Sequence, residues 1–153
     1  MPQFKSSASH YVLSTSTGAL NVTGDGTDYT VKFDTKIADA DGEYNSSTGV
    51  FTAKMAGLRH FAWNITLRDI GSGDGFTLAW TTLVATGGTF KMDAHFAASA
   101  QAGGSYLTLK GVVSVFMNVG DTAHIEAVVY GGAKTAGVYA TAAFNTLSIH
   151  LVR

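Results

Sequence analysis

The amino-acid sequence predicts an all-β domain of the sandwich or jelly-roll type, and three observations support this. Glycine is abundant, with 18 residues, whereas proline occurs once among 153 residues. Thr, Val, Tyr and Phe recur in short alternating runs that end at Gly, Asp, Asn or Ser, which is typical of strands joined by turns. No long segment has the period of a helix. The alanine-rich residues 94–104 hold few apolar anchors and end in two glycines, so we expect a strand or loop there.

The chain length of 153 residues suits a single domain with one hydrophobic core. Ten strands are predicted in this domain. They cover residues 11–14, 29–34, 50–53, 58–68, 76–85, 89–97, 105–118, 122–130, 137–139 and 145–152. A turn-rich segment at residues 23–27 separates the first two. We expect residues 21–153 to form the jelly roll and residues 1–20 to form an N-terminal segment that docks elsewhere or swaps between subunits.

Three of these strands show a clear core face and a mixed second face. In residues 58–67, one face carries Arg59, Phe61, Trp63, Ile65 and Leu67. Successive side chains of a strand point to opposite faces, so we expect this set to face the core. Residues 122–130 and 145–152 alternate in the same way. The second face of each of the three strands holds one histidine, namely His60, His124 and His150.

Composition excludes several classes of function. The net charge is −1, which does not favour a nucleic-acid partner or an anionic membrane. Cysteine is absent, so disulfides, thiolate catalysis and cysteine-bound metals are excluded. No apolar run is long enough to span a membrane, and residues 1–6 lack the apolar core of a signal peptide. Only 14% of residues are charged, and we expect that much of the surface is buried in an assembly.

An aromatic pattern is spaced along the chain between Phe33 and Trp63, with a further member at Phe144. Its members are Phe33, Tyr44, Phe51, Gly57, Phe61, Trp63 and Phe144, and we expect the aromatic ones to lie in the core. For Phe144, as for Tyr130 and Tyr139, a place at a subunit interface is the alternative. This pattern, with Asp39 inside it and Gly120-Asp121 downstream, resembles the signature of the complement C1q globular head and the tumour-necrosis-factor-like family. Arg59 stands where the family typically has tyrosine, and Asn145-Thr146 replaces the usual Ser-Gly. Residues 23–35 resemble the bacterial or phage type of such domains.

The resemblance implies a ten-stranded jelly roll that assembles as a homotrimer. It also implies that the strands at 58–68, 122–130 and 145–152 share one sheet, whose outer face meets neighbouring subunits. The trimer-interface candidates on those strands are His60, Asn64, His124, Glu126, Tyr130, Ser148 and His150. If the first and last of these strands are antiparallel neighbours, His60 lies beside His150. Such a pair either forms hydrogen bonds at the interface, or binds a metal or anion and loosens the trimer in acid.

Other chemical sites have weak support in the sequence. Asp34, Asp39 and Asp41 are calcium candidates by ligand type, but they lack the spacing of an EF-hand, and turns favour aspartate for backbone reasons. The glycine-rich segments 71–75 and 131–135 lack the phosphate-loop pattern. No catalytic motif is visible. We therefore expect neither an enzyme nor a bound cofactor, and no established metal site.

Two functions fit this description. The first is a homotrimeric structural protein of a virion, such as a head decoration, spike or fibre knob of a phage, assembled in the host cytoplasm with other virion proteins. The alternative is a trimeric recognition module that binds a cell-surface glycan or protein through its end loops. Those loops, at residues 71–75, 102–105 and 131–137, contain no aromatic residue, which favours the structural function.

Overall fold

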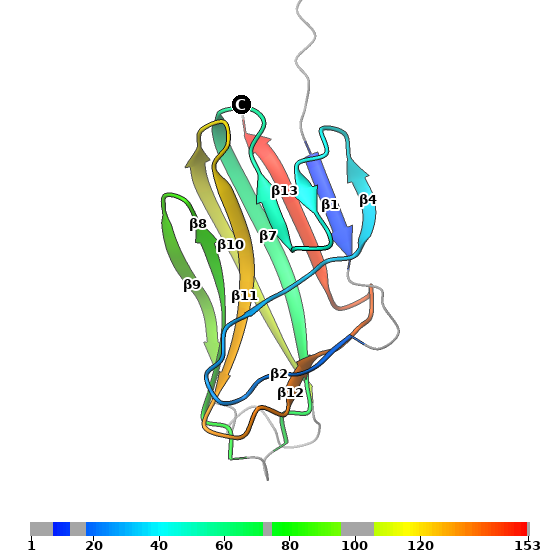
Figure 1. Cartoon of the computed structure of the whole chain (residues 1–153), viewed down its shortest axis with the longest axis vertical. Helices are drawn as coiled ribbons and strands as arrows, with labels where there is room; N and C mark the ends of the chain where they lie inside the picture. Colours follow the sequence, from blue (N-terminus) through cyan, green and yellow to red (C-terminus); the bar gives the residue numbers. More distant parts are fainter. Residues whose placement is uncertain (1–7, 13–17, 72–74, 96–105, 153) are drawn as a thin grey trace, which may run out of the picture.

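The chain forms a sandwich of two antiparallel sheets in a computed structural model (Figure 1), which describes residues 8–12, 18–71, 75–95 and 106–152. The seven-stranded sheet contains β1 (Ala8–Val12), β2 (Ala19–Thr23), β4 (Thr35–Asp39), β7 (Gly57–Arg68), β10 (Leu107–Met117), β12 (Ala136–Val138) and β13 (Thr146–Val152). The six-stranded sheet contains β3 (Tyr29–Thr30), β5 (Tyr44–Asn45), β6 (Val50–Thr52), β8 (Leu78–Ala85), β9 (Gly88–His95) and β11 (Thr122–Tyr130). No helix that could cross a membrane occurs in these ranges.

The long strands lie close to their predicted positions. The strand predicted at residues 122–130 is β11, and those at 58–68, 105–118 and 145–152 are β7, β10 and β13, each within two residues at either end. The strand predicted at residues 29–34 is shorter, because only Tyr29–Thr30 pairs with β11. Strands β2, β4 and β5 were not predicted. Their exposed polar residues, as in β4, lack the apolar alternation that marks a half-buried strand.

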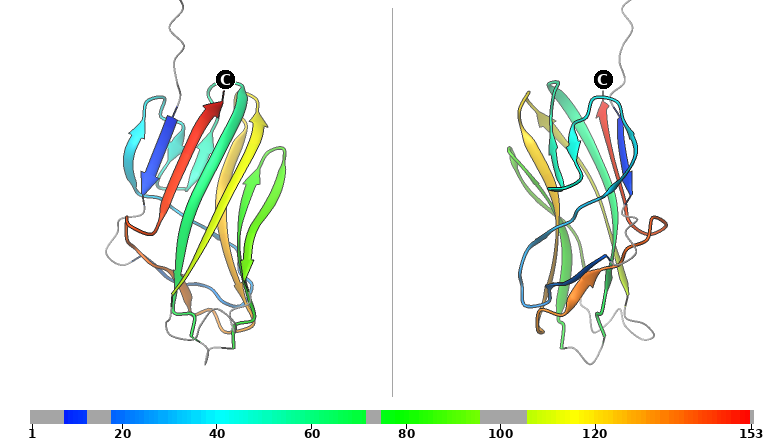
Figure 2. Two further views of the ribbon diagram at one scale, coloured as in Figure 1. Left: turned by 180° about the vertical axis from the view of Figure 1, so that it is seen from behind. Right: turned by 45° about the vertical axis from the view of Figure 1, so that its right-hand side comes forward.

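The N-terminal strand belongs to the seven-stranded sheet of its own chain. β1 lies between β13 and β4, and it is antiparallel to both. Figure 2, left, looks onto this sheet and shows β4, β1, β13, β7 and β10 side by side. Residues 8–12 are therefore paired within the fold, while a docking or swapping role for residues 1–20 stays a prediction.

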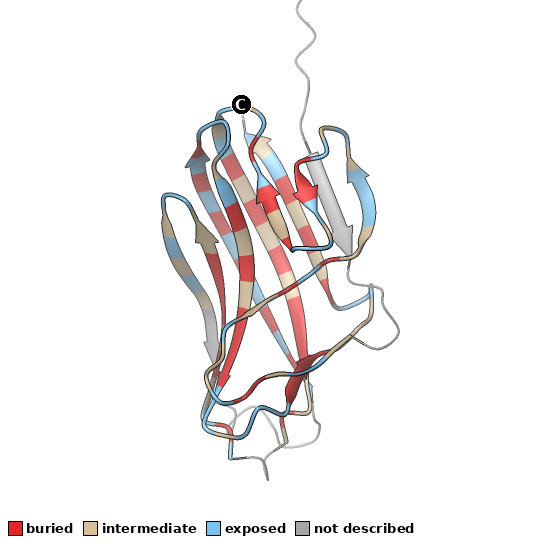
Figure 3. Ribbon diagram, viewed as in Figure 1, coloured by how far each residue is buried: buried red, intermediate tan, exposed pale blue. Residues whose placement is uncertain are grey.

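Buried residues alternate with less buried ones along the long strands (Figure 3), and the predicted aromatic residues belong to the core between the sheets. Phe33, Tyr44, Phe51, Phe61 and Trp63 are all buried. The Phe51 and Phe61 rings meet edge to face with centroids 5.6 Å apart, a favoured aromatic geometry. The Trp63 indole N–H donates to the Thr81 hydroxyl across the sandwich at 3.0 Å. This last contact joins β7 of one sheet to β8 of the other.

Glycines are required at two positions on and beside β7. Gly57 has a φ of +154°, and a Cβ atom there would lie 2.5 Å from Leu151 Cδ1. Gly111 of β10 pairs with Trp63, and a Cβ there would lie 2.0 Å from Trp63 Cζ2. The indole ring therefore occupies the space above Gly111 that a side chain would fill.

A buried ion pair closes one end of the core. Arg59 faces inward, as its position in β7 predicts, and its Nη2 atom lies 2.7 Å from Glu43 Oε1. Both side chains are almost fully shielded from solvent, at 1% and 0% exposure. Arg59 also donates to the Met55 carbonyl at 3.2 Å, and its guanidinium lies 5.4 Å from the Phe51 ring centroid. Nothing in the sequence identified Glu43 as the partner of Arg59.

Two sequence predictions are wrong. The strand at residues 122–130 does not share a sheet with β7 and β13, since β11 lies in the six-stranded sheet. Its second face, with His124, Glu126 and Tyr130, is therefore on the opposite side of the molecule from His60 and His150. Alternation assigns side chains to faces but carries no information about which sheet a strand joins.

The second error concerns Phe144, which is not part of the core. Its side chain is 53% exposed, in the turn that precedes β13. The neighbouring Asn145 is fully buried instead. The aromatic pattern contains no information about the direction of the Phe144 side chain, and a residue in a turn is free to point outward.

Candidate interface on the seven-stranded sheet

The outer face of the seven-stranded sheet is organised in layers across β10, β7 and β13. Each layer takes one residue from each strand, because the three strands are paired in continuous antiparallel register. The layers are Phe116–Leu58–Val152, Ser114–His60–His150, Val112–Ala62–Ser148 and Lys110–Asn64–Thr146. Buried residues alternate with these along each strand, so the layered residues all lie on the side away from the core.

Large apolar side chains are exposed in the first and third layers. Phe116 is 63% exposed and Val112 is 58% exposed. Leu58 and Val152, which flank Phe116 in the first layer, are also exposed. Exposed apolar side chains gathered on one face mark a binding surface more often than scattered ones do.

The remaining layers hold polar side chains that bond to one another. His60 Nδ1 lies 3.0 Å from Ser114 Oγ, and the Asn64 amide donates to the Thr146 hydroxyl at 3.0 Å. The predicted neighbour relation of His60 and His150 is confirmed, since these residues are directly opposite in the β7–β13 register. Of the seven interface candidates, the fold thus brings together His60, Asn64, Ser148 and His150.

An aromatic cavity continues this face beyond the last layer. Thr66, Tyr106, Thr108, Tyr139 and Phe144 line a cavity of about 320 Å³. The Tyr106 and Tyr139 rings meet with centroids 4.8 Å apart, and the Thr66 and Thr108 hydroxyls lie 2.8 Å apart at its wall. The sequence offered a place at an interface for Tyr139 and Phe144, but only the fold brings them together with Tyr106.

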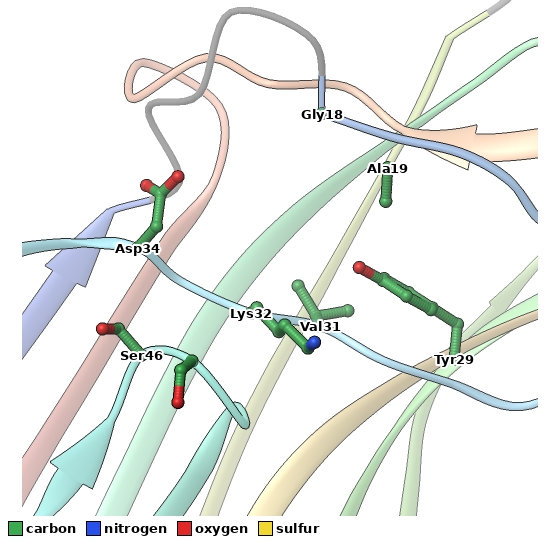
Figure 4. A pocket seen from close by; sticks show the side chains of 8 residues that line it. Gly18, Ala19, Tyr29, Val31, Lys32, Asp34 and Ser46 are labelled. Carbon is green, nitrogen blue, oxygen red and sulfur yellow. The ribbon is translucent and has the colours of Figure 1, made fainter.

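A second, more polar cavity lies on the side where residues 29–34 cross between the sheets (Figure 4). It has a volume of about 220 Å³ and is lined by Gly18, Ala19, Tyr29, Val31, Lys32, Asp34, Ser46 and Ser47. The Tyr29 hydroxyl points into it. Burial raises the pKa of this phenol, so it stays a neutral hydrogen-bonding group.

The opposite face of the molecule, on the six-stranded sheet, carries the other three interface candidates. His124 Nε2 lies 3.0 Å from Glu126 Oε1, which forms a local pair within β11. The Tyr130 ring stacks on Trp80 at 4.9 Å between centroids, and the Lys91 ammonium lies 3.9 Å from the Trp80 centroid. The indole is thus held between a phenol and a cation, and these contacts are satisfied within one chain.

The aspartates proposed as calcium ligands are used in turns. Asp39 accepts hydrogen bonds from the Glu43 and Tyr44 amides, at 3.1 and 3.4 Å, and Asp34 accepts one from the Thr35 hydroxyl. The Asp41 backbone carbonyl accepts a bond from the Lys54 ammonium. Within the described ranges, no group of three or more His, Cys, Asp or Glu side chains is arranged to hold a metal ion.

Comparison with known proteins identifies the family. The sequence matches the C1q domain over residues 16–145, which is most of the chain. The chain belongs to the C1q domain family. A comparison with curated protein sequences finds no match. The resemblance seen in the sequence is therefore confirmed at the level of the family, while the bacterial or phage origin stays a prediction.

Solved structures of this family and its tumour-necrosis-factor-like neighbours share the fold. The globular domain of zebrafish complement 1qA is similar with a TM-score of 0.67 at 16% identity, covering 97% of this chain and 98% of that one. Murine APRIL is similar with a TM-score of 0.66 at 10% identity, and the match covers 97% of this chain and 100% of that one. Eiger TNF from S. frugiperda is similar with a TM-score of 0.63 at 12% identity, and the match covers 98% of this chain and 94% of that one. At these identities the likeness establishes the jelly roll alone.

Proposed function

We propose that this C1q domain is a non-catalytic homotrimer whose subunits meet through the outer face of the seven-stranded sheet. One observation carries the proposal: Phe116, Val112, Leu58 and Val152 are exposed together on that face. Burying apolar surface contributes about 25 cal/mol per Å², so these side chains favour an assembly that covers them. Three-fold symmetry is the arrangement that the resemblance to C1q and tumour-necrosis-factor domains implies.

The test is molar mass by light scattering after size exclusion. The wild-type protein is expected to have about three times the 16.0 kDa mass of the chain. Phe116→Glu places a charge in the apolar layer and is expected to give monomers. Thr89→Glu is the matched control, because Thr89 is exposed on β9 of the other sheet. A wild-type monomer, or a Phe116→Glu protein that keeps its mass, would contradict the proposal.

The biological role that we propose for the trimer is structural, as a head decoration, spike or fibre knob of a phage virion. A low-charge, cysteine-free sheet protein can fold in the reducing cytoplasm where virions assemble, and three linked subunits give multivalent contact with a symmetric surface. The experiment is binding of the purified trimer to virus particles stripped of their accessory proteins. Saturable binding supports the role, and its absence on particles from the natural host argues against it.

A recognition function is the second candidate, and the aromatic cavity favours it. Tyr106, Tyr139 and Phe144 present aromatic rings near the end of the sandwich, where the end loops themselves supply none. Aromatic rings and threonine hydroxyls are suited to sugar rings, which have both apolar faces and polar edges. A glycan array probed with the wild type and with Tyr106→Ala tests this function. Binding that the substitution removes would support recognition.

A further inference from the structure

We infer that His60 and His150 form a binding site for a divalent transition metal ion, with Zn²⁺ as the ion of choice, on the outer face of the seven-stranded sheet. The two residues are directly opposite in the antiparallel register of β7 and β13. Cβ atoms of such pairs are about 4.5–5.5 Å apart. Zinc–nitrogen bonds are about 2.0–2.1 Å long, so two imidazoles at this separation can reach one ion.

Both imidazoles are available on the outer face. His60 lies between buried Arg59 and Phe61 in β7, and it is itself partly exposed. His150 follows buried Ile149 and is exposed. In a single chain, a site made from them is therefore open to ions from solvent, and it requires no change in the core.

Ser114 of β10 orients the first ligand. His60 Nδ1 is 3.0 Å from Ser114 Oγ, which allows Nδ1–H to donate to the hydroxyl and leaves the Nε2 lone pair for the metal. A hydrogen bond of this kind, from the nitrogen that does not bind the ion, is a general feature of histidine metal ligands. Ser114 is thus a positioning residue for the site.

The surrounding chemistry selects the class of metal. The described outer positions of β7, β10 and β13 carry no carboxylate, and the closest charged group on them is Lys110, two layers away. Imidazole without carboxylate favours zinc, copper or nickel over calcium and magnesium.

Two imidazoles fill half of the tetrahedral shell that zinc prefers. In the proposed trimer, the same face of each subunit points toward its neighbours, and equivalent histidines supply the remaining ligands. This completion of the shell rests on the proposed function, whereas the two-histidine site of a single chain does not.

The experiment is calorimetric titration of the full chain with Zn²⁺, with light scattering on the same samples. The wild type is expected to bind zinc at micromolar concentration, and His60→Gln and His150→Gln are each expected to remove the binding. Ser114→Ala is expected to weaken it by about tenfold, as loss of an orienting hydrogen bond does. His124→Gln is the matched control, because His124 is paired with Glu126 on the other sheet, and it is expected to leave binding unchanged.

The outcomes separate the metal site from the trimer. The metal site is refuted if the protein is a trimer that binds no zinc, or if His60→Gln and His150→Gln bind zinc as well as the wild type. Either result leaves the proposed trimer intact. A monomer whose zinc binding needs both histidines refutes the trimer and keeps the site. Circular dichroism establishes that each variant is folded; the exposed His150 is the substitution least able to disturb the core.

Discussion

Replacing Arg59 with methionine removes the cation that faces a carboxylate with no exposed surface. Arg59 Nη2 and Glu43 Oε1 are 2.7 Å apart and both side chains are almost fully shielded from solvent, so the substitution leaves the carboxylate buried without its cation. Breaking a buried pair by removing one partner costs about 3–5 kcal/mol. In a chain of this size each kcal/mol lowers Tm by about 2–4 °C, so Arg59→Met is expected to lower Tm by roughly 6–20 °C.

Two further variants test the cause of that loss. Arg68→Met, on the same strand, removes the cation from the Arg68–Asp69 pair, which is partly open to solvent at 30% and 44% exposure and is expected to contribute about 0–1 kcal/mol. The double variant Arg59→Met with Glu43→Met replaces both charges by apolar groups and is expected to recover most of the loss. The assays are urea unfolding and thermal melting at fixed protein concentration. If Arg59→Met is no less stable than Arg68→Met, the electrostatic reasoning is wrong.

Three other predictions concern single contacts, all measured by urea unfolding. Gly111→Ala is expected to cost about 1–3 kcal/mol, because its Cβ would overlap the Trp63 ring. Asn145→Ala is expected to cost about 1–3 kcal/mol, since the buried Thr66 N–H loses an acceptor at 2.7 Å. Burial raises the Tyr44 pKa from 10.0 to about 12. Between these pH values the folded chain holds more protons on this phenol than the unfolded chain, so stability should fall by roughly 2–3 kcal/mol as pH rises, and Tyr44→Phe should lack this fall. A wild-type-like result for any of these variants would count against the contact concerned.

Part of the candidate interface could be predicted from the sequence. Alternation put His60 and His150 on the outer faces of their strands, and the family resemblance implied that these strands are antiparallel neighbours, which the register confirms. Val112 and Phe116 were not predicted as exposed. Both faces of β10 carry apolar residues, so its sequence lacks the apolar–polar alternation that would assign them to the outer face. The aromatic cavity was missed for another reason: Tyr106, Tyr139 and Phe144 lie in separate segments that meet only after the sheets have formed.

The fold class, the positions of the long strands and most of the aromatic core could be predicted from the amino-acid sequence. These features depend on local properties of the sequence, because apolar residues alternate with a period of two in strands and glycines mark the turns between them. Three features are evident only in the folded chain: β11 joins the six-stranded sheet, Arg59 pairs with Glu43, and Phe144 is exposed. Each of these depends on pairing between residues far apart in the sequence, and the pairing is set by the packing of all strands together.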